Sequence, residues 1–420
     1  MKTTILIGAG FSYDLGMPLS SDFTETFLSI YDKNSTLELE KKLSSNQPFG
    51  EGRPINRKAI NEGLELILNY KNNNGKNYEE LLAKLQDLEH EPRKTQSDKD
   101  SYYYLFSSLY KIIHHIFCFY QIASYQVLYP VNSKFYANFR DILNEKETWV
   151  FSLNHDNFIE MLCSDLQIPL TYGDSNRIEF PIDNRSLDKK IKLTFSYREN
   201  LSLKNSKFFS EKFGINLIKL HGGLSELEYQ DKKKLCNIDI DGKSSHEIFE
   251  EFLKIDEMAY YQNGKRIPSG KDMVITNSYG ELDIISKSML TGGKKYSKTL
   301  KIQKGEEKLS LFNDVLNNTT ELLILGYGFG DKHINFRIAD QLAKNSNFSI
   351  RIIDPVKTKI PESFEAYDYD NRIKRAFCGA PVWFDYSKTE KWNSLQINEL
   401  KKTTQYRSEI KEIVRKKLFK

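Results

Sequence analysis

The sequence has few cysteines, and no two of them have the spacing of a structural zinc site. The four cysteines, Cys118, Cys163, Cys236 and Cys378, are far apart, and none belongs to a Cys-x-x-Cys motif. We therefore expect neither a disulfide framework nor a zinc or other metal site. This cysteine usage fits a reducing compartment, and we expect a cytoplasmic location.

Features of several other protein classes are missing as well. The 420 residues contain no low-complexity block, and Gly8, Gly10 and Asp14 interrupt the N-terminal apolar stretch, unlike a signal peptide. The most apolar stretch, residues 101–131, contains Lys111 and two histidines, which argues against a membrane span. The net charge of +4 is small for this length, so overall charge does not indicate nucleic-acid binding.

What the sequence does contain is a short apolar run that leads into a glycine turn and a helix start. The run Thr4–Ile7 is typical of a buried parallel strand, and Gly8 and Gly10 allow close approach of a phosphate to the backbone. The first N–H groups of the next helix would then face a pyrophosphate. Tyr13 stands where the dinucleotide fingerprint has its third glycine, so the dehydrogenase pattern does not apply. A tight turn without a ligand is the alternative.

Further strand-like runs occur along the chain, and most of them end at a polar or glycine cluster. They are Thr148–Leu153, Lys192–Ser196, Asn216–Leu220, Glu321–Leu325 and Ser349–Ile353. Strands joined by helical stretches predict an α/β fold with a doubly wound parallel sheet of the Rossmann-like kind. Ligands of such sheets bind at the carboxyl ends of the strands.

The periodicity of the remaining stretches predicts the domain organisation. Residues 1–32 would form the first part of a nucleotide-binding domain, with a helix at residues 20–30, and residues 33–145 a helical insertion. Residues 146–400 would complete the domain, with a lysine-rich elaboration at 225–309 that covers the site. Residues 401–420 hold eight Lys or Arg and two Glu, and they predict a basic C-terminal helix that is either a solvated face or a nucleic-acid contact.

Three of the later strand ends carry polar clusters like that of the first. Asn154–Asn157 reads Asn-His-Asp-Asn, His221–Gly223 reads His-Gly-Gly, and Gly326–His333 is a glycine-rich turn. Because the carboxyl ends of parallel strands lie at one edge of the sheet, we expect these clusters to lie together.

Taken in order, the four clusters resemble the sirtuin-like (silent-information-regulator-like) NAD-binding family, in particular its bacterial branch. The matching motifs are Gly-Ala-Gly-Phe-Ser at residue 8, Asn-x-Asp at 154, Leu-His-Gly at 220 and Gly-Tyr-x-Phe-Gly-Asp-x-His-Ile at 326. The resemblance covers about residues 1–25 and 146–380. Protein deacylases of the family carry two Cys-x-x-Cys pairs after the Leu-His-Gly motif, where this chain has Cys236 alone, and His155 also departs from many relatives.

The resemblance implies that Asn154 and His221 are catalytic, and their chemistry agrees. Cleavage between nicotinamide and ribose passes through an oxocarbenium-like state and needs a polar group that holds ribose and water, plus a base. An amide both donates and accepts, and an imidazole titrates near neutral pH. The alternatives are that Asn154 caps a helix and that His221 is a turn residue.

We expect the other nucleotide contacts from the same strand ends. Asp331 and His333 would close the last turn and help to hold the nucleotide, and Asp354 would bind the adenosine ribose unless it only forms an Asp-Pro turn. The predicted contact residues are Gly8, Ala9, Gly10, Phe11, Ser12, Asp156, Gly326, Tyr327, Gly328, Asp331, His333 and Asp354.

The predicted function is hydrolysis of NAD, the substrate, to nicotinamide and ADP-ribose, and the resemblance implies NAD depletion in anti-phage defence. The alternatives are a protein deacylase or ADP-ribosyltransferase, and a non-catalytic nucleotide sensor or DNA-binding module. Because a free NADase would harm its host, we expect a gated homo-oligomer that assembles through the aromatic helix face of residues 106–120. Relatives of this length suggest a HerA-type ring ATPase as partner.

Overall fold

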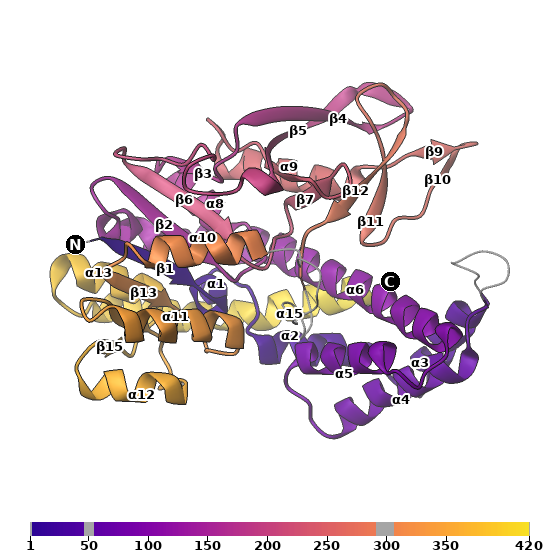
Figure 1. Ribbon diagram of the computed structural model, residues 1–420, viewed down its shortest axis with the longest axis horizontal. Helices are drawn as coiled ribbons and strands as arrows, with labels where there is room; N and C mark the ends of the chain where they lie inside the picture. Colours follow the sequence, from indigo (N-terminus) through magenta and orange to yellow (C-terminus); the bar gives the residue numbers. More distant parts are fainter. Residues whose placement is uncertain (1, 46–53, 291–305, 420) are drawn as a thin grey trace. The chain divides into compact units, whose positions relative to one another are not determined.

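A computed structural model describes residues 2–45, 54–290 and 306–419 of the chain, and these residues form two compact units (Figure 1). The described residues of the sheet unit fall within Met1–Met17, Ser124–Met289 and Lys298–Arg407. Those of the helical unit fall within Pro18–Ala123, Leu290–Ser297 and Ser408–Lys420. Every motif that the sequence analysis assigned to the nucleotide site belongs to the sheet unit.

The sheet unit contains a seven-stranded parallel sheet in the order β15-β14-β13-β1-β2-β6-β3. Its strands are β1 (Thr3–Ile7), β2 (Glu147–Ser152), β3 (Leu170–Thr171), β6 (Gly214–Lys219), β13 (Glu321–Leu325), β14 (Ser349–Ile353) and β15 (Ile373–Ala376). The first strand, β1, lies in the middle of the seven. The later strands follow outward on either side, except for the short β3, which lies beyond β6. This order is compatible with a Rossmann-like fold. The switch point of this topology lies between β1 and β13. The predicted parallel α/β sheet is therefore confirmed.

Helices cover the parallel sheet, because successive residues of β6 and β13 point to opposite faces and all of them are buried. Apart from the helices that accompany the second sheet, those of this unit include α1 (Ala9–Tyr13), α7 (Tyr129–Asn132), η1 (Ser133–Ile142), α8 (Phe158–Asp165), α10 (Glu306–Leu316), α11 (Lys332–Lys344), α12 (Glu362–Tyr369), α13 (Ala380–Thr389) and α14 (Ser394–Thr403). Helices connect β1 to β2, β2 to β3, β13 to β14 and β14 to β15, so each of these connections returns the chain to a parallel strand.

A second, six-stranded antiparallel sheet in the order β11-β12-β7-β8-β5-β4 was not predicted. It consists of β4 (Asn176–Asp183), β5 (Ser186–Tyr197), β7 (Glu226–Tyr229), β8 (Lys234–Ile238), β11 (Asp272–Thr276) and β12 (Leu282–Lys287). Helix α9 (Ser245–Glu257) packs on it, and η2 (Arg198–Asn200) and the hairpin β9 (Tyr261–Gln262)–β10 (Lys265–Arg266) complete the region. The run Lys192–Ser196, which we expected in the parallel sheet, belongs to β5. Part of the lysine-rich stretch 225–309 lies outside the described residues.

The helical unit contains α2 (Ser20–Ser29), α3 (Lys33–Ser44), α4 (Arg57–Asn72), α5 (Tyr78–His90) and most of α6 (Gln96–Val127). Its core includes Phe23, which stacks on Phe117 with ring centroids 4.1 Å apart. The stripe on α6 that we expected to drive assembly is largely core as well, because Leu109, Ile113 and Ile116 are completely buried. Of the two interpretations of this stretch, a buried core helix or a self-association surface, the burial of the stripe favours the core helix. No described helix is long and apolar enough to cross a membrane.

The basic C-terminal stretch belongs to two helices, because α14 ends before Thr404 and α15 (Gln405–Leu418) begins after it. Arg407 lies over the ring of Tyr13 at 3.4 Å from its centroid and donates hydrogen bonds to the carbonyl oxygens of Tyr13 and Met17. Part of the stretch therefore holds the chain that follows α1.

Candidate functional site

The first turn of the site is held by close packing of glycine backbones at the switch point. The N–H of Gly10 donates to the carbonyl oxygen of Gly326 at 2.9 Å, which joins the turn after β1 to the turn after β13. A Cβ on Gly8 would lie 2.7 Å from that oxygen, and a Cβ on Gly10 would lie 2.7 Å from the Cα of Gly326. Gly326 itself has φ +63°. The glycines are thus required by this backbone contact.

The short helix α1 offers less to a pyrophosphate than the sequence suggested. It has five residues, and the N–H of Phe11 donates to the carbonyl oxygen of Gly8 at 2.9 Å. The ring of Phe11 is buried against Tyr136 and Phe139, so its side chain belongs to the core. Ala9 is the exposed residue of the turn.

The second cluster connects β2 to the first turn through side chains. The amide of Asn154, at the end of β2, donates to the carbonyl oxygen of Gly8 at 2.9 Å and to the hydroxyl of Ser12 at 3.1 Å. Ser12 in turn donates to the carboxylate of Asp156 at 3.0 Å. Complete burial raises the pKa of Asp156 to about 6, although the nearby Lys219 ammonium acts in the opposite direction. The expected neighbourhood of the first two motifs is therefore present.

The third cluster follows β6 and meets the fourth. The Nε2 atom of His221 lies 2.7 Å from the Oδ2 atom of Asp331, and both side chains are largely buried. Gly222 has φ +67°, and a Cβ there would lie 2.6 Å from the hydroxyl oxygen of Ser288, so this position needs glycine. His155 approaches the same turn, with its Nδ1 atom 3.2 Å from the carbonyl oxygen of Gly222.

The fourth cluster is a turn that is organised by Tyr327 and Asp331. Asp331 caps α11, because its Oδ1 atom accepts hydrogen bonds from the N–H groups of His333 and Ile334. The hydroxyl of the buried Tyr327 accepts from the N–H of Asp331 at 3.0 Å and donates toward Asn335. These bonds fix the direction in which the Asp331 carboxylate points.

Two other glycines of this turn lack the steric reason that holds for Gly326. A Cβ on Gly328 or Gly330 would have no described atom within 4 Å, and both positions are exposed. Free space beside a glycine at a strand end is where a ligand can approach the backbone closely.

Asp354 follows β14, one strand further from the switch point. Its Oδ1 atom accepts the N–H of Val356 at 2.8 Å, which is the bond of an Asp-initiated turn, and partial burial raises the pKa of its carboxyl group. The alternative that Asp354 forms a turn is thus present in the structure, and its contact with a ribose stays a prediction.

Buried charges behind the site were missed from the sequence. The Nζ atom of Lys219 lies 2.6 Å from the Oε1 atom of Glu160 on α8 and donates to the carbonyl oxygen of Asp156 at 2.6 Å. Lys308, on α10, donates to the carbonyl oxygen of Lys219 at 2.8 Å and pairs with Glu226 on β7. Both pairs are almost completely buried. The available signal was a lysine within the strand-like run Asn216–Leu220.

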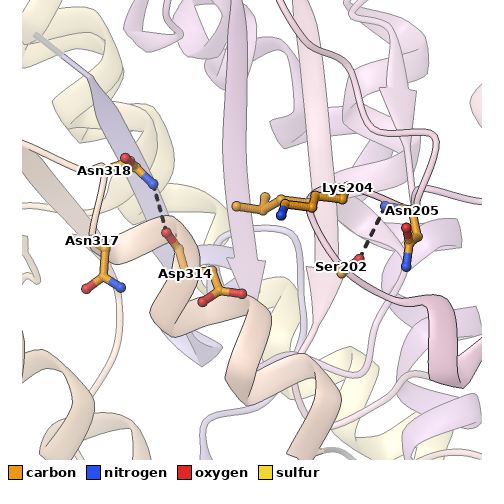
Figure 2. A pocket seen from close by; sticks show the side chains of 7 residues that line it. Ser202, Lys204, Asn205, Asp314, Asn317 and Asn318 are labelled. Carbon is orange, nitrogen blue, oxygen red and sulfur yellow. Dashed lines mark hydrogen bonds between the residues drawn. The ribbon is translucent and has the colours of Figure 1, made fainter.

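A cavity of about 400 Å³ lies elsewhere in the sheet unit (Figure 2). Its lining residues are Ser202, Leu203, Lys204, Asn205, Asp314, Asn317 and Asn318. Asn317 and Asn318 precede β13, so they lie before its amino end, whereas the candidate site follows the carboxyl ends. A strand of five residues spans roughly 17 Å, which separates the two ends. This cavity is therefore distinct from the candidate site.

The four sequence clusters thus meet at the carboxyl edge of β13, β1, β2 and β6, which are neighbours in this order. Hydrogen bonds join Gly8, Ser12, Asn154 and Asp156 in one group, and His221 lies against Asp331 in another. A scan against protein-family models and a search of the curated proteins gave no match.

Proposed function

We propose that the protein is an NAD hydrolase with a sirtuin-like nucleotide-binding domain, and that it cleaves the bond between nicotinamide and ribose. The observation that carries this proposal is the meeting of a glycine turn, an amide and a histidine–carboxylate pair at the carboxyl ends of adjacent parallel strands. That edge is where such sheets bind dinucleotides. The exposed backbone at Ala9, Gly328 and Gly330 offers places for the phosphates.

The proposed reaction needs little covalent chemistry from the protein. As the bond from C1′ to the nicotinamide nitrogen breaks, its electron pair leaves with nicotinamide, and C1′ acquires oxocarbenium character. Asn154 orients the ribose and the attacking water, and His221 removes a proton from that water. The products are ADP-ribose, nicotinamide and a proton that is later released to solvent.

One observation supports a second candidate, a nucleotide sensor without turnover. The amide nitrogen of Asn154 already donates to Gly8 and Ser12, which is what a residue that only shapes the turn would do. In this case the same edge binds a nucleotide, but neither Asn154 nor His221 is needed for chemistry.

The purified 420-residue chain is incubated with NAD, and the products are separated by chromatography, with and without an acetylated peptide. Substitution of Asn154 or His221 by Ala should lower turnover on the order of 10²-fold or more, while circular dichroism stays unchanged. Because the two residues act in one step, the double variant should lose little more than the worse single variant.

Exposed residues of the same unit supply matched controls. Asn347→Ala and His246→Ala make the same chemical changes at exposed positions, and both variants should keep full turnover. Normal hydrolysis by Asn154→Ala and His221→Ala, with NAD binding retained, would favour the sensor. Products that form only with the peptide would favour a deacylase or transferase.

The proposal includes a biological setting, namely NAD depletion that arrests a phage-infected cell. Gating by self-assembly or by a HerA-type ring ATPase belongs to the same proposal, as does a nucleic-acid contact through the basic C-terminus. Incubation with such an ATPase or with DNA before the turnover assay tests whether either of them changes NAD hydrolysis.

A further inference from the structure

Hydrogen bonds connect the backbone of Gly8 to three buried side chains that follow β1 and β2. The carbonyl oxygen of Gly8 accepts a hydrogen bond from Nδ2 of Asn154 at 2.9 Å, and the hydroxyl of Ser12 accepts one from the same nitrogen at 3.1 Å. Ser12 donates its own hydrogen to Oδ1 of Asp156 at 3.0 Å. The exposed fractions of Ser12, Asp156 and Asn154 are 1%, 4% and 8%, so water competes little for these bonds. The three bonds form the Asn154 network.

The direction of each bond in the Asn154 network is fixed from its two ends. A backbone carbonyl oxygen can only accept, so the NH₂ group of Asn154 must face Gly8. At the other end, Oδ1 of Asp156 also accepts the N–H of Phe158 at 3.1 Å. This atom is therefore an acceptor whether the carboxyl group is ionised or carries a proton on Oδ2. Ser12 consequently donates to Asp156 and accepts from Asn154, because the reversed arrangement would place the carbonyl oxygens of Asn154 and Gly8 against each other.

This arrangement decides which atom of Asn154 a ligand can meet. Nδ2 has two hydrogens, and both are donated within the Asn154 network, so the carbonyl oxygen Oδ1 is left for a substrate. Such an oxygen accepts from a hydroxyl group or from water, but it repels a phosphate oxygen. Ser12 has likewise donated its one hydrogen, so its hydroxyl cannot donate to a phosphate as well.

We propose that Ser12 and Asp156 are positioning residues for Asn154, which turn its carbonyl oxygen toward the substrate without touching the nucleotide themselves. This inference rests on the proposed function. In the reaction Oδ1 of Asn154 accepts a hydrogen bond from the ribose or from the attacking water and holds that group in place at C1′. No proton passes to or from the Asn154 network, and the bonds that form and break are those of NAD hydrolysis.

Ser12→Ala in the 420-residue chain is the first test. The change removes the middle of the network but keeps Cβ, and Ala fits a helix at least as well as Ser. One of the two bonds that hold the Asn154 amide is lost, so kcat for NAD should fall on the order of 10-fold, whereas KM should change less than about threefold. A hydroxyl that bound the nucleotide directly would give the opposite result, with KM raised and kcat retained. Ser387→Ala removes an exposed hydroxyl of the same unit and should change neither value.

Two substitutions of Asp156 separate hydrogen bonding from charge. Asp156→Asn keeps an acceptor, because the donors of Ser12 and Phe158 draw the amide oxygen to the position of Oδ1. Asp156→Leu has a similar size and no acceptor, so kcat should fall on the order of 10- to 10²-fold, and the Asn variant should recover most of that loss. If the carboxylate instead stabilised the oxocarbenium-like state by its charge, both variants would lose turnover equally. Equal loss in both, or full turnover in Ser12→Ala, would overturn the proposal.

The state of the amide is also read without turnover, from ¹H–¹⁵N correlation spectra of protein labelled at the asparagine side chains. The NH₂ signals of Asn154 are identified by their absence in Asn154→Ala. In wild type both hydrogens should exchange slowly with water, because each is donated to a buried oxygen. In Ser12→Ala the hydrogen that faced Ser12 should exchange faster, and in Asp156→Asn both should exchange as in wild type. A purely structural role predicts lower stability in urea, with kcat and the exchange of the Asn154 hydrogens unchanged.

The variants also distinguish failure of this inference from failure of the proposed function. If wild type does not hydrolyse NAD, the proposed function is refuted, but the exchange of the Asn154 hydrogens still decides whether Ser12 and Asp156 hold the amide. If wild type hydrolyses NAD and Ser12→Ala does so equally well, the function stands and the positioning role is refuted. If Asp156→Leu does not fold, the comparison of Asp156→Asn with Ser12→Ala decides, because the Asn variant should then lose less turnover.

Discussion

Removal of the Lys219 ammonium should strongly destabilise the sheet unit. The side chains of Lys219 and Glu160 are 2% and 0% exposed, and their charged atoms lie 2.6 Å apart. Lys219→Met keeps a side chain of similar length but leaves the Glu160 carboxylate buried without its counter-ion. Among the described residues the Oε2 atom of Glu160 has no hydrogen-bond partner, so Lys219 provides the main compensation for this charge.

Breaking one side of a buried ion pair costs about 3–5 kcal/mol, because the remaining charge has no partner. Removing both charges should cost less, since Lys219→Met/Glu160→Gln leaves no uncompensated ion, and Gln can still accept from the hydroxyl of Tyr172. The double variant should therefore be more stable than Lys219→Met, by about 2 kcal/mol.

The measurement is urea unfolding followed by tryptophan fluorescence. The three tryptophans, Trp149, Trp383 and Trp392, all lie in the sheet unit, so their emission reports the unit that contains the ion pair. Lys344→Met, which breaks the exposed pair with Asp340, is the matched control and should cost less than about 1 kcal/mol. A loss below about 1 kcal/mol for Lys219→Met, or a double variant less stable than the single one, would refute the reasoning.

Three further predictions concern the turns and the C-terminus. Gly8→Ala should destabilise the sheet unit by about 1–3 kcal/mol, because its Cβ would meet backbone 2.7 Å away, whereas Gly328→Ala should leave urea unfolding unchanged and weaken NAD binding. Burial raises the pKa of Asp156 to about 6, so the folded state binds the carboxyl proton more tightly than the unfolded state. The free energy of unfolding should therefore fall as pH rises from about 4 to 6. In urea titrations, Asp156→Asn should reduce this dependence on pH. Deletion of residues 408–420 should leave the tryptophan-detected free energy of unfolding unchanged. A deletion that includes Arg407 should lower this free energy, because the bonds to Tyr13 and Met17 are lost.

The parallel sheet could be predicted because its strands can be recognised from short stretches of sequence. Glu321–Leu325 and Ser349–Ile353 are short apolar runs, and their predicted bounds are those of β13 and β14. Such runs need no distant partner to be recognised, since burial on both faces favours a continuous apolar stretch. The neighbourhood of the four polar clusters then follows from the parallel arrangement.

The antiparallel sheet could not be predicted in the same way, because charged residues are buried in its strands. All residues of β7 and β8 are buried, including Glu226, Glu228 and Lys234. Glu226 is neutralised by Lys308 and Glu228 by Arg198, which are distant in the sequence. Without these partners the charged residues indicate solvated positions, so the sequence does not predict strands that are buried on both faces.

The glycines of the site show how a motif can be explained by a contact that the sequence does not reveal. We attributed Gly8 and Gly10 to close approach of a phosphate, but in the structure their missing side chains make room for Gly326. That contact joins the two strands at the switch point and would be required in the sensor as much as in the hydrolase. A ligand is therefore a better explanation for Gly328 and Gly330, where an added Cβ would meet no described atom within 4 Å apart from the two chain neighbours. A Cβ at these positions disturbs nothing in the described chain, so an effect of Gly328→Ala on NAD binding without an effect on folding would have to come from the nucleotide itself.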